Sequence, residues 1–107
     1  MNKQNIILIG MPGAGKSSVG VILAKVLGYE FIDTDLVIQH REKRLLREII
    51  ADEGNEGFLA IENEVNATLE ADKSVIAPGG SAIYGKEAME HFKEIGTIVY
   101  LKLSYED

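Results

Sequence analysis

The feature that most constrains this chain is the run GMPGAGKS at residues 10–17, which matches the G-x-x-x-x-G-K-S pattern of a phosphate-binding loop in full. The run IILI at residues 6–9 precedes it, is uncharged and apolar, and predicts a buried parallel strand. After Lys16, apolar residues recur at helical spacing up to Gly28, which predicts a helix that ends there. This strand, loop and helix together predict a parallel α/β sheet.

The residue types of the loop explain how it would bind phosphate. Glycines let the backbone turn tightly, so that N–H groups converge on one phosphate, and the start of the following helix adds positive potential. Lys16 supplies a mobile positive charge for the β- and γ-phosphates, and the hydroxyl of Ser17 is a ligand suited to Mg²⁺. We therefore predict that the chain binds ATP with Mg²⁺. The predicted nucleotide-binding residues are Gly13, Ala14, Gly15, Lys16, Ser17 and Ser18.

The rest of the chain continues the alternation of strands and helices. Further strands are predicted at residues 29–32, 74–77 and 97–101. Helical spacing predicts helices in pieces over residues 36–71, interrupted at Gly54, and a short helix over residues 86–94. The alternation indicates a parallel α/β sheet, and 107 residues allow a single small domain.

Composition narrows the classes of partner. The formal net charge is −6, which argues against binding nucleic acid through a basic surface. The chain has no cysteine, and hence no disulfide framework, which fits a reducing compartment. Its apolar runs are too short to span a bilayer, and its N-terminus has no signal-peptide pattern. We expect a cytoplasmic protein that binds neither nucleic acid nor a membrane.

Polar and glycine residues follow the second and third predicted strands. Asp33 and Asp35 come after one strand, and the run PGGS at residues 78–81 comes after the other. Because ligands bind beyond the carboxyl ends of parallel strands, we expect these residues to face the same crevice as the phosphate-binding loop. One aspartate could hold Mg²⁺ through water and the other could accept a proton from a substrate hydroxyl. The alternatives are an aspartate that caps the next helix and an ordinary tight turn at the glycines.

Taken together, these motifs resemble the shikimate kinase family, small P-loop kinases of aromatic amino-acid biosynthesis. The resemblance also includes FIDTD at residues 31–35, Glu-Gly-x-x-x-Phe at residues 53–58 with a following Glu62, and GTIVYL at residues 96–101, in matching order along the chain. It implies ATP-dependent transfer of phosphate to a hydroxyl of shikimate or a similar small metabolite. It also implies strand order 2-3-1-4, a missing fifth strand, and helices on both faces.

The resemblance assigns roles to individual residues. Asp33 would support the Mg²⁺ site beside Ser17. Asp35 would bind ring hydroxyls and help to activate the attacking one, which makes Asp35 and Lys16 the predicted catalytic residues. The predicted substrate-binding residues are Asp35, Phe58, Glu62, Gly79, Gly80 and Ser81. For Glu62, the helical pattern alone leaves a solvated surface acid as the alternative.

Two positions depart from the family pattern. The family has Phe-Arg-x-x-Glu, whose arginine grips the substrate carboxylate, and here Leu59 stands at the position of that arginine. Loss of a buried charge-assisted contact of this kind costs about 2–5 kcal/mol. Either Arg41, Arg44 or Arg47 takes over the role, or the substrate lacks that carboxylate. The second departure is Ser81, where the family has a third glycine.

The chain is also shorter than members of this family, whose further residues supply a lid over the ATP, a second carboxylate-binding arginine and the fifth strand. We therefore expect a single domain that is incomplete at its C-terminus. Its strand at residues 97–103 would be an exposed apolar edge through which the chain self-associates. Two other functions stay open: a P-loop kinase for a different hydroxylated metabolite, and a nucleotide-binding module without catalysis.

Overall fold

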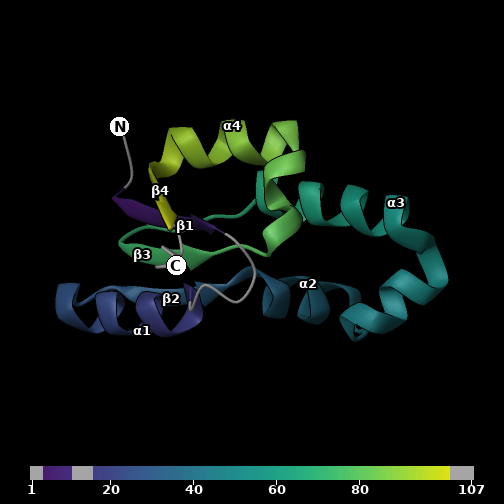
Figure 1. The fold of residues 1–107 in the computed structure, drawn as a ribbon, viewed down its shortest axis with the longest axis horizontal. Helices are drawn as coiled ribbons and strands as arrows, with labels where there is room; N and C mark the ends of the chain where they lie inside the picture. The colour runs from purple at the N-terminus through teal and green to yellow at the C-terminus, as the bar shows by residue number, and fades with distance from the viewer. Residues whose placement is uncertain (1–3, 11–15, 102–107) are drawn as a thin grey trace, which may run out of the picture.

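The computed structural model describes residues 4–10 and 16–101, so that residues 11–15 and the side chains of Lys16 and Ser17 lie outside the described part. The strands are β1 Asn5–Gly10, β2 Glu30–Asp33, β3 Ser74–Ala77 and β4 Gly96–Leu101 (Figure 1). The helices are α1 Lys16–Leu27, α2 Thr34–Glu42, α3 Leu46–Ala67, the 3₁₀-helix η1 Gly80–Tyr84, and α4 Lys86–Ile95. The four predicted strands are confirmed, each to within one residue at either end.

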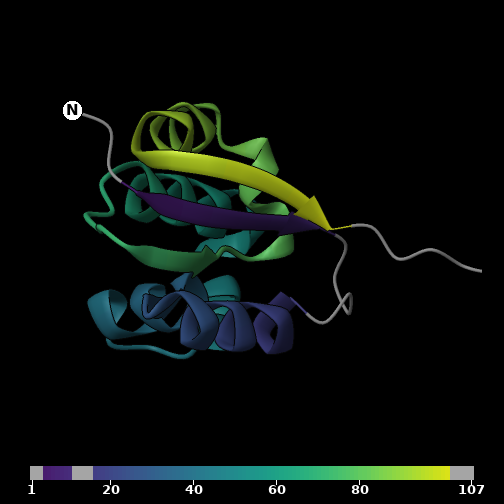
Figure 2. The same cartoon turned by 90° about the vertical axis from the view of Figure 1, so that its left-hand side faces the viewer.

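The strands form one parallel sheet of order β2-β3-β1-β4, which confirms the predicted order. The central strand β1 pairs with β3 on one side and with β4 on the other. Helix α1 covers one face of the sheet, and α4 covers the other (Figures 1 and 2). Within the described residues, no strand pairs with the outer edge of β4.

The sheet is buried on both faces at its centre. Ile7 of β1 packs in a cluster with Phe92 of α4, and neither side chain is exposed to solvent. The next residue, Leu8, points to the opposite face and packs with Ala24 of α1. This explains the uninterrupted apolar sequence of the strand, because a half-exposed strand would alternate apolar and polar residues.

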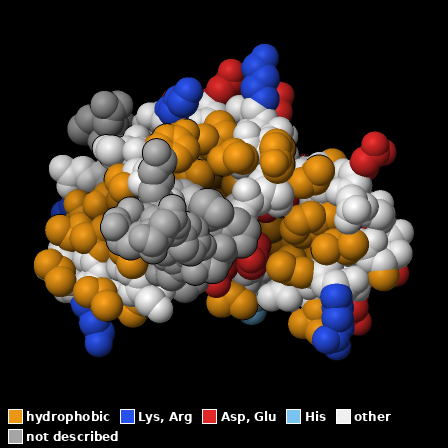
Figure 3. All heavy atoms as spheres, in the orientation of Figure 1, with side chains coloured by type: hydrophobic (Ala, Val, Ile, Leu, Met, Phe, Trp, Pro, Cys, Tyr) orange, Lys and Arg blue, Asp and Glu red, His pale blue; other side chains and the backbone are white. Residues whose placement is uncertain are grey.

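Helix α1 forms where the helical spacing of its apolar residues predicts it. However, many of these apolar residues do not face the sheet. Val19, Ile22 and Val26 have exposed fractions of 42%, 63% and 76%. Small residues face the sheet instead, and a Cβ at Gly20 would lie only 2.5 Å from Cε1 of Phe31. Apolar side chains accordingly appear on the surface around α1, at the lower left of Figure 3. The close approach of helix and strand therefore depends on the absence of a side chain.

Helices α2 and α3 form an arm beyond the carboxyl ends of the strands (Figure 1). The arm has its own apolar cluster around Ile38, Ile49 and Val65. The predicted interruption at Gly54 is confirmed as a kink in α3, where φ is 76° and ψ is 173°. In the described part of the chain, no helix combines the length and the hydropathy needed to cross a bilayer.

Candidate functional site

The strand and the helix that flank the predicted phosphate-binding loop lie where the sequence predicts them. Strand β1 ends at Gly10 and helix α1 begins at Lys16, and Ser18 is exposed in the first turn of the helix. Gly10 packs closely against the neighbouring strand, since a Cβ there would lie 2.6 Å from the carbonyl oxygen of Leu101. The predicted roles of Gly13, Ala14 and Gly15, and of the side chains of Lys16 and Ser17, lie outside the described residues.

Asp33 lies at the carboxyl end of β2 and is the N-cap of α2. Its Oδ1 accepts a hydrogen bond of 3.0 Å from the backbone N–H of Asp35, which confirms the capping interpretation for this residue. Among the described residues, no three carboxylate or histidine side chains gather to hold a metal. Magnesium usually keeps several waters and takes one or two protein ligands besides phosphate oxygens. The carboxylate of Asp33 and the hydroxyl of Ser17 are chemically suited to such a site.

Asp35 and Glu62 come together around Gly79. A Cβ at Gly79 would lie 3.0 Å from Oδ1 of Asp35 and 3.2 Å from Oε2 of Glu62. The φ of Gly79 is −64°, which every residue type adopts, so the close approach of the two carboxylates explains the glycine. Helices α2 and α3 thereby bring two hydrogen-bond acceptors to the end of β3, at the predicted edge of the sheet.

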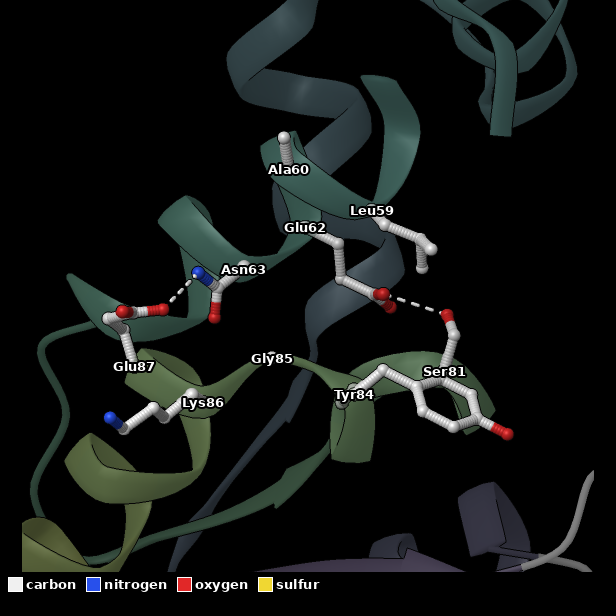
Figure 4. Close-up of a pocket in the computed structure, with 10 residues that line it drawn as sticks. Leu59, Ala60, Glu62, Asn63, Ser81, Tyr84, Gly85, Lys86 and Glu87 are labelled. Carbon is white, nitrogen blue, oxygen red and sulfur yellow. Dashed lines mark hydrogen bonds between the residues drawn. The ribbon is translucent and has the colours of Figure 1, made fainter. Parts of the chain in front are cut away.

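Ser81 joins this cluster through Glu62. Its hydroxyl donates a hydrogen bond of 2.7 Å to Oε1 of Glu62 (Figure 4). The Glu62 residue is only 2% exposed, so the alternative of a solvated surface acid is wrong. The glycine run does not end in a simple tight turn either, because Gly80 and Ser81 begin the 3₁₀-helix η1. Acidic side chains are visible at the middle of this face, beside an apolar area over α2 and α3 (Figure 3).

Phe58 and Leu59 are neighbours in the sequence, but their side chains lie in different surroundings. Phe58 is half-buried and packs on the apolar cluster of the α2–α3 arm, and it is not among the residues that line the pocket described next. Leu59 is 37% exposed and lines a pocket of about 280 Å³ together with Glu62, Ser81 and Tyr84 (Figure 4). The position that departs from the family pattern is therefore next to the carboxylate cluster.

None of the three arginines of the chain lines this pocket. Arg41 pairs with Glu64 at 3.2 Å, on the surface. Arg44 pairs with Glu42 and Asp52, each at 3.0 Å, and the hydrogen bonds to Asp52 and Glu42 raise its pKa. The third, Arg47, is exposed on α3. The structure thus gives no support to an arginine from this segment as a replacement at position 59.

Sequence reasoning missed Asn63, which fixes the start of α4. Its Oδ1 accepts a hydrogen bond of 2.9 Å from the backbone N–H of Ala88, and its Nδ2 donates one of 2.9 Å to Oε1 of Glu87. The latter bond lowers the pKa of Glu87. The N-cap of α4 is Gly85, which has no side chain to offer, so Asn63 supplies the missing acceptor from α3. That glycine is the only hint in the sequence that a distant partner is needed.

Comparisons with known proteins agree with this geometry. A sequence model of the family described as shikimate kinase matches residues 12–107. Shikimate kinase 2 of Yersinia enterocolitica is 40% identical over 101 residues, which make up 94% of this chain and 58% of that protein.

Solved structures give the same result. Shikimate kinase from Acinetobacter baumannii in complex with shikimate has a TM-score of 0.85 and 36% identity, over 95% of this chain and 57% of that one. Shikimate kinase from Aquifex aeolicus has a TM-score of 0.81 and 32% identity, over 95% of this chain and 61% of that one. The chain thus spans less than two thirds of the length of these relatives. On its sequence, its strand order and its match along residues 12–107, it belongs to the shikimate kinase family.

Proposed function

We propose that this chain is the part of an ATP-dependent small-molecule kinase that binds the nucleotide phosphates and the hydroxylated substrate. The observation that carries the proposal is the convergence of Asp35 and Glu62 on Gly79, at the sheet edge where β1 leads into the phosphate-binding loop. Hydroxyl groups of shikimate or of a similar small metabolite would donate hydrogen bonds to these carboxylates. The solved relative that holds shikimate supports this choice of substrate class.

The proposed chemistry is transfer of the γ-phosphoryl group of ATP to a substrate hydroxyl, with ADP as the second product. Lys16 would hold the β- and γ-phosphates, and Ser17 and Asp33 would hold Mg²⁺, which neutralises phosphate charge when bound. Asp35 would orient the attacking hydroxyl and accept its proton. Gly79 and Gly80 would let the substrate approach the backbone, and Phe58 would support this wall of the site.

The setting of this activity is part of the same proposal. We propose that residues 1–107 form one kinase-like domain that works in the cytoplasm on a nucleotide and a small metabolite, rather than on nucleic acid or at a membrane. Self-association is proposed to use the outer edge of β4, where Val99 and Tyr100 are 37% and 66% exposed. Size-exclusion chromatography with light scattering tests this. A stable monomer at about 100 µM, within the range in which exposed strand edges ordinarily associate, would contradict it.

The direct test of the kinase is coupled detection of ADP release with a panel of small hydroxylated acids and polyols. We expect ADP release that depends on substrate and is lost in Asp35→Asn, while Glu70→Gln, an exposed acid outside the cluster, keeps it. Binding of Mg·ATP without transfer to any compound would instead favour the nucleotide-binding module without catalysis.

A further inference from the structure

Two buried polar side chains, one on α2 and one on α3, have no hydrogen-bond partner among the described residues. Asn66 of α3 is 0% exposed, and both Nδ2 and Oδ1 of its side-chain amide lack a partner. Thr34 of α2 is also 0% exposed, and its Oγ1 lacks a partner. Buried polar groups are almost always hydrogen-bonded, because an unpaired group loses the hydration that it has in the unfolded chain. These two side chains therefore need a partner that the protein itself does not supply.

Asn5 shows how protein groups satisfy the same residue type elsewhere in this fold. Its residue is 2% exposed, and its Nδ2 donates hydrogen bonds of 2.9 Å to the carbonyl oxygens of Ala71 and Ile95. Its Oδ1 accepts a hydrogen bond of 3.0 Å from the backbone N–H of Ser74. The side chain of Asn66 is at least as deeply buried and makes no bond of either kind. The two asparagines therefore differ in their partners and not in their burial.

Thr34 and Asn66 belong to the same junction of the fold. Thr34 lies one helical turn before Ile38, on the same face of α2. Ile38 packs in one apolar cluster with Val65 of α3, and Val65 directly precedes Asn66. Asn66 also lies one turn after Glu62, which is another buried residue of α3. The packing of α2 against α3 therefore encloses both unpartnered side chains in the interior of this junction.

Water is the ligand that suits these groups. The amide of asparagine offers N–H donors and a carbonyl acceptor, and the hydroxyl of threonine both donates and accepts. A water molecule also donates and accepts, and internal waters typically make about three hydrogen bonds to buried polar groups of this kind. Because Thr34 and Asn66 are fully covered, a larger ligand or a further segment of protein could not reach them without opening the junction.

We propose that an internal water binds at the junction of α2 and α3, hydrogen-bonded to the amide of Asn66 and to the hydroxyl of Thr34. Thr34 directly precedes Asp35, and Asn66 follows Glu62 by one turn. The water thus joins the two helices that carry the proposed substrate carboxylates. The inference does not depend on the proposed function, because it concerns only groups that are buried behind that site.

Rotating-frame NOE spectroscopy of the isotope-labelled full chain detects such a water through cross-peaks between its protons and the side-chain amide protons of Asn66. We expect a cross-peak with the sign of a dipolar contact, which distinguishes bound water from proton exchange. Asn5 is the matched control, since its buried amide is satisfied by protein groups and should show no such cross-peak. Thr34→Val removes the hydroxyl and nearly keeps the shape of the side chain, so the cross-peak at Asn66 should be lost. Asn66→Val identifies the amide signal, and triple-resonance assignment of the wild type does so if that variant does not fold.

Each outcome decides the inference. Absence of a water cross-peak at Asn66 overturns it, and so does a cross-peak of equal strength at Asn5, because the signal would then be unrelated to missing protein partners. A cross-peak that persists unchanged in folded Thr34→Val overturns the role of Thr34. If that variant does not fold by circular dichroism, a crystal structure of the wild-type chain decides instead. It should show a water within about 3.2 Å of both Oγ1 of Thr34 and an amide atom of Asn66, and a water beside Asn66 alone would overturn the role of Thr34.

Discussion

The proposed site has two halves: a phosphate half, formed by residues 10–17, and a substrate half, formed around Asp35, Glu62 and Gly79. The two halves differ in how closely their residues follow the family pattern. In the phosphate half, residues 10–17 carry the loop pattern without a departure. In the substrate half, Leu59 and Ser81 depart from it, and both line the same pocket as Glu62. Phosphate binding relies largely on backbone N–H groups and one lysine, and every nucleoside triphosphate presents the same phosphates. Substrate recognition relies on side chains, which can be exchanged when the substrate differs.

The largest effect that separates the halves is expected with shikimate itself. We expect little or no turnover of shikimate, because Leu59 removes a carboxylate partner that is worth about 2–5 kcal/mol, or roughly 30- to 4000-fold. Coupled ADP release measures it, with Mg·ATP binding by the same preparation as the control. Turnover in the ordinary range for kinases, roughly 1–100 per second, would contradict the importance of position 59.

A smaller effect is expected in the phosphate half. Lys16→Ala should weaken binding of Mg·ATP by roughly 10- to 150-fold, because hydrogen bonds to charged groups contribute about 1.5–3 kcal/mol. Titration calorimetry measures the change, and Lys25→Ala in the last turn of the same helix is the control. Equal affinities in the wild type and Lys16→Ala would rule out the assigned role of this lysine.

In the substrate half, Gly79→Ala should weaken binding of the hydroxylated ligand and leave Mg·ATP binding unchanged. The added Cβ would lie 3.0 Å from Oδ1 of Asp35 and 3.2 Å from Oε2 of Glu62, so one or both carboxylates must move. Binding of the hydroxylated ligand should fall about tenfold, in keeping with about 1–2 kcal/mol for a local shift in a packed site, while Mg·ATP binding stays unchanged. Ile83→Ala, at a position of η1 that is 46% exposed and does not line the pocket, is the control for the folding of η1. A parallel loss of both ligands would mean that the halves are not separable.

The smallest effect concerns helix α4, whose start is held by Asn63 next to the substrate half. Asn63→Ala removes the acceptor that caps α4, and it should lower the free energy of unfolding by about 1 kcal/mol, as loss of a helix cap does. Urea denaturation at neutral pH measures this. Asn55→Ala, a substitution on the exposed first half of α3, is the control.

The same variant has a signature at acidic pH. The hydrogen bond from Asn63 lowers the pKa of Glu87 below its ordinary value of 4.5 in the folded chain. The stabilisation is therefore fully present above that pH and is lost as the pH falls through the lowered folded pKa. The stability difference between Asn63→Ala and the wild type should therefore shrink over this acidic range, while the part due to the cap of α4 remains. A difference that stays constant from neutral pH down to pH of about 3 would contradict the role of Glu87.

The sequence predicted much of the fold because the signals were local. The strand order followed from the family resemblance, and Gly28 and Gly54 marked the end of one helix and the kink of another, with φ of 72° and 76°. The outward stripe of α1 could not be predicted, because helical spacing does not say which side of a helix meets the sheet. There the side with Gly20 and Ala24 packs inward, since only small residues allow the helix to approach β2 and the centre of the sheet.

The site was predictable in its residues more than in their contacts. Asp35, Glu62 and Gly79 were assigned to one site from the sequence, and the structure brings them together. The hydrogen bond between Ser81 and Glu62, and the capping of α4 by Asn63, join segments that are far apart in the chain. Contacts of this kind depend on how α3 packs against η1 and α4, and local sequence patterns do not predict that packing.

Amide NMR with the two ligands added in turn tests the central claim most directly, because it reports on both halves of the site in one chain. Mg·ADP should shift the amide signals of residues 10–18. Shikimate, at saturating concentration, should then shift those of Asp35, Glu62, Gly79 and Ser81. Signals of Lys93 and Thr97, at the opposite end of the sheet, should stay in place. If the hydroxylated ligand shifts that opposite end instead, or if it leaves Glu62 and Gly79 unchanged, the carboxylate cluster is not its binding site.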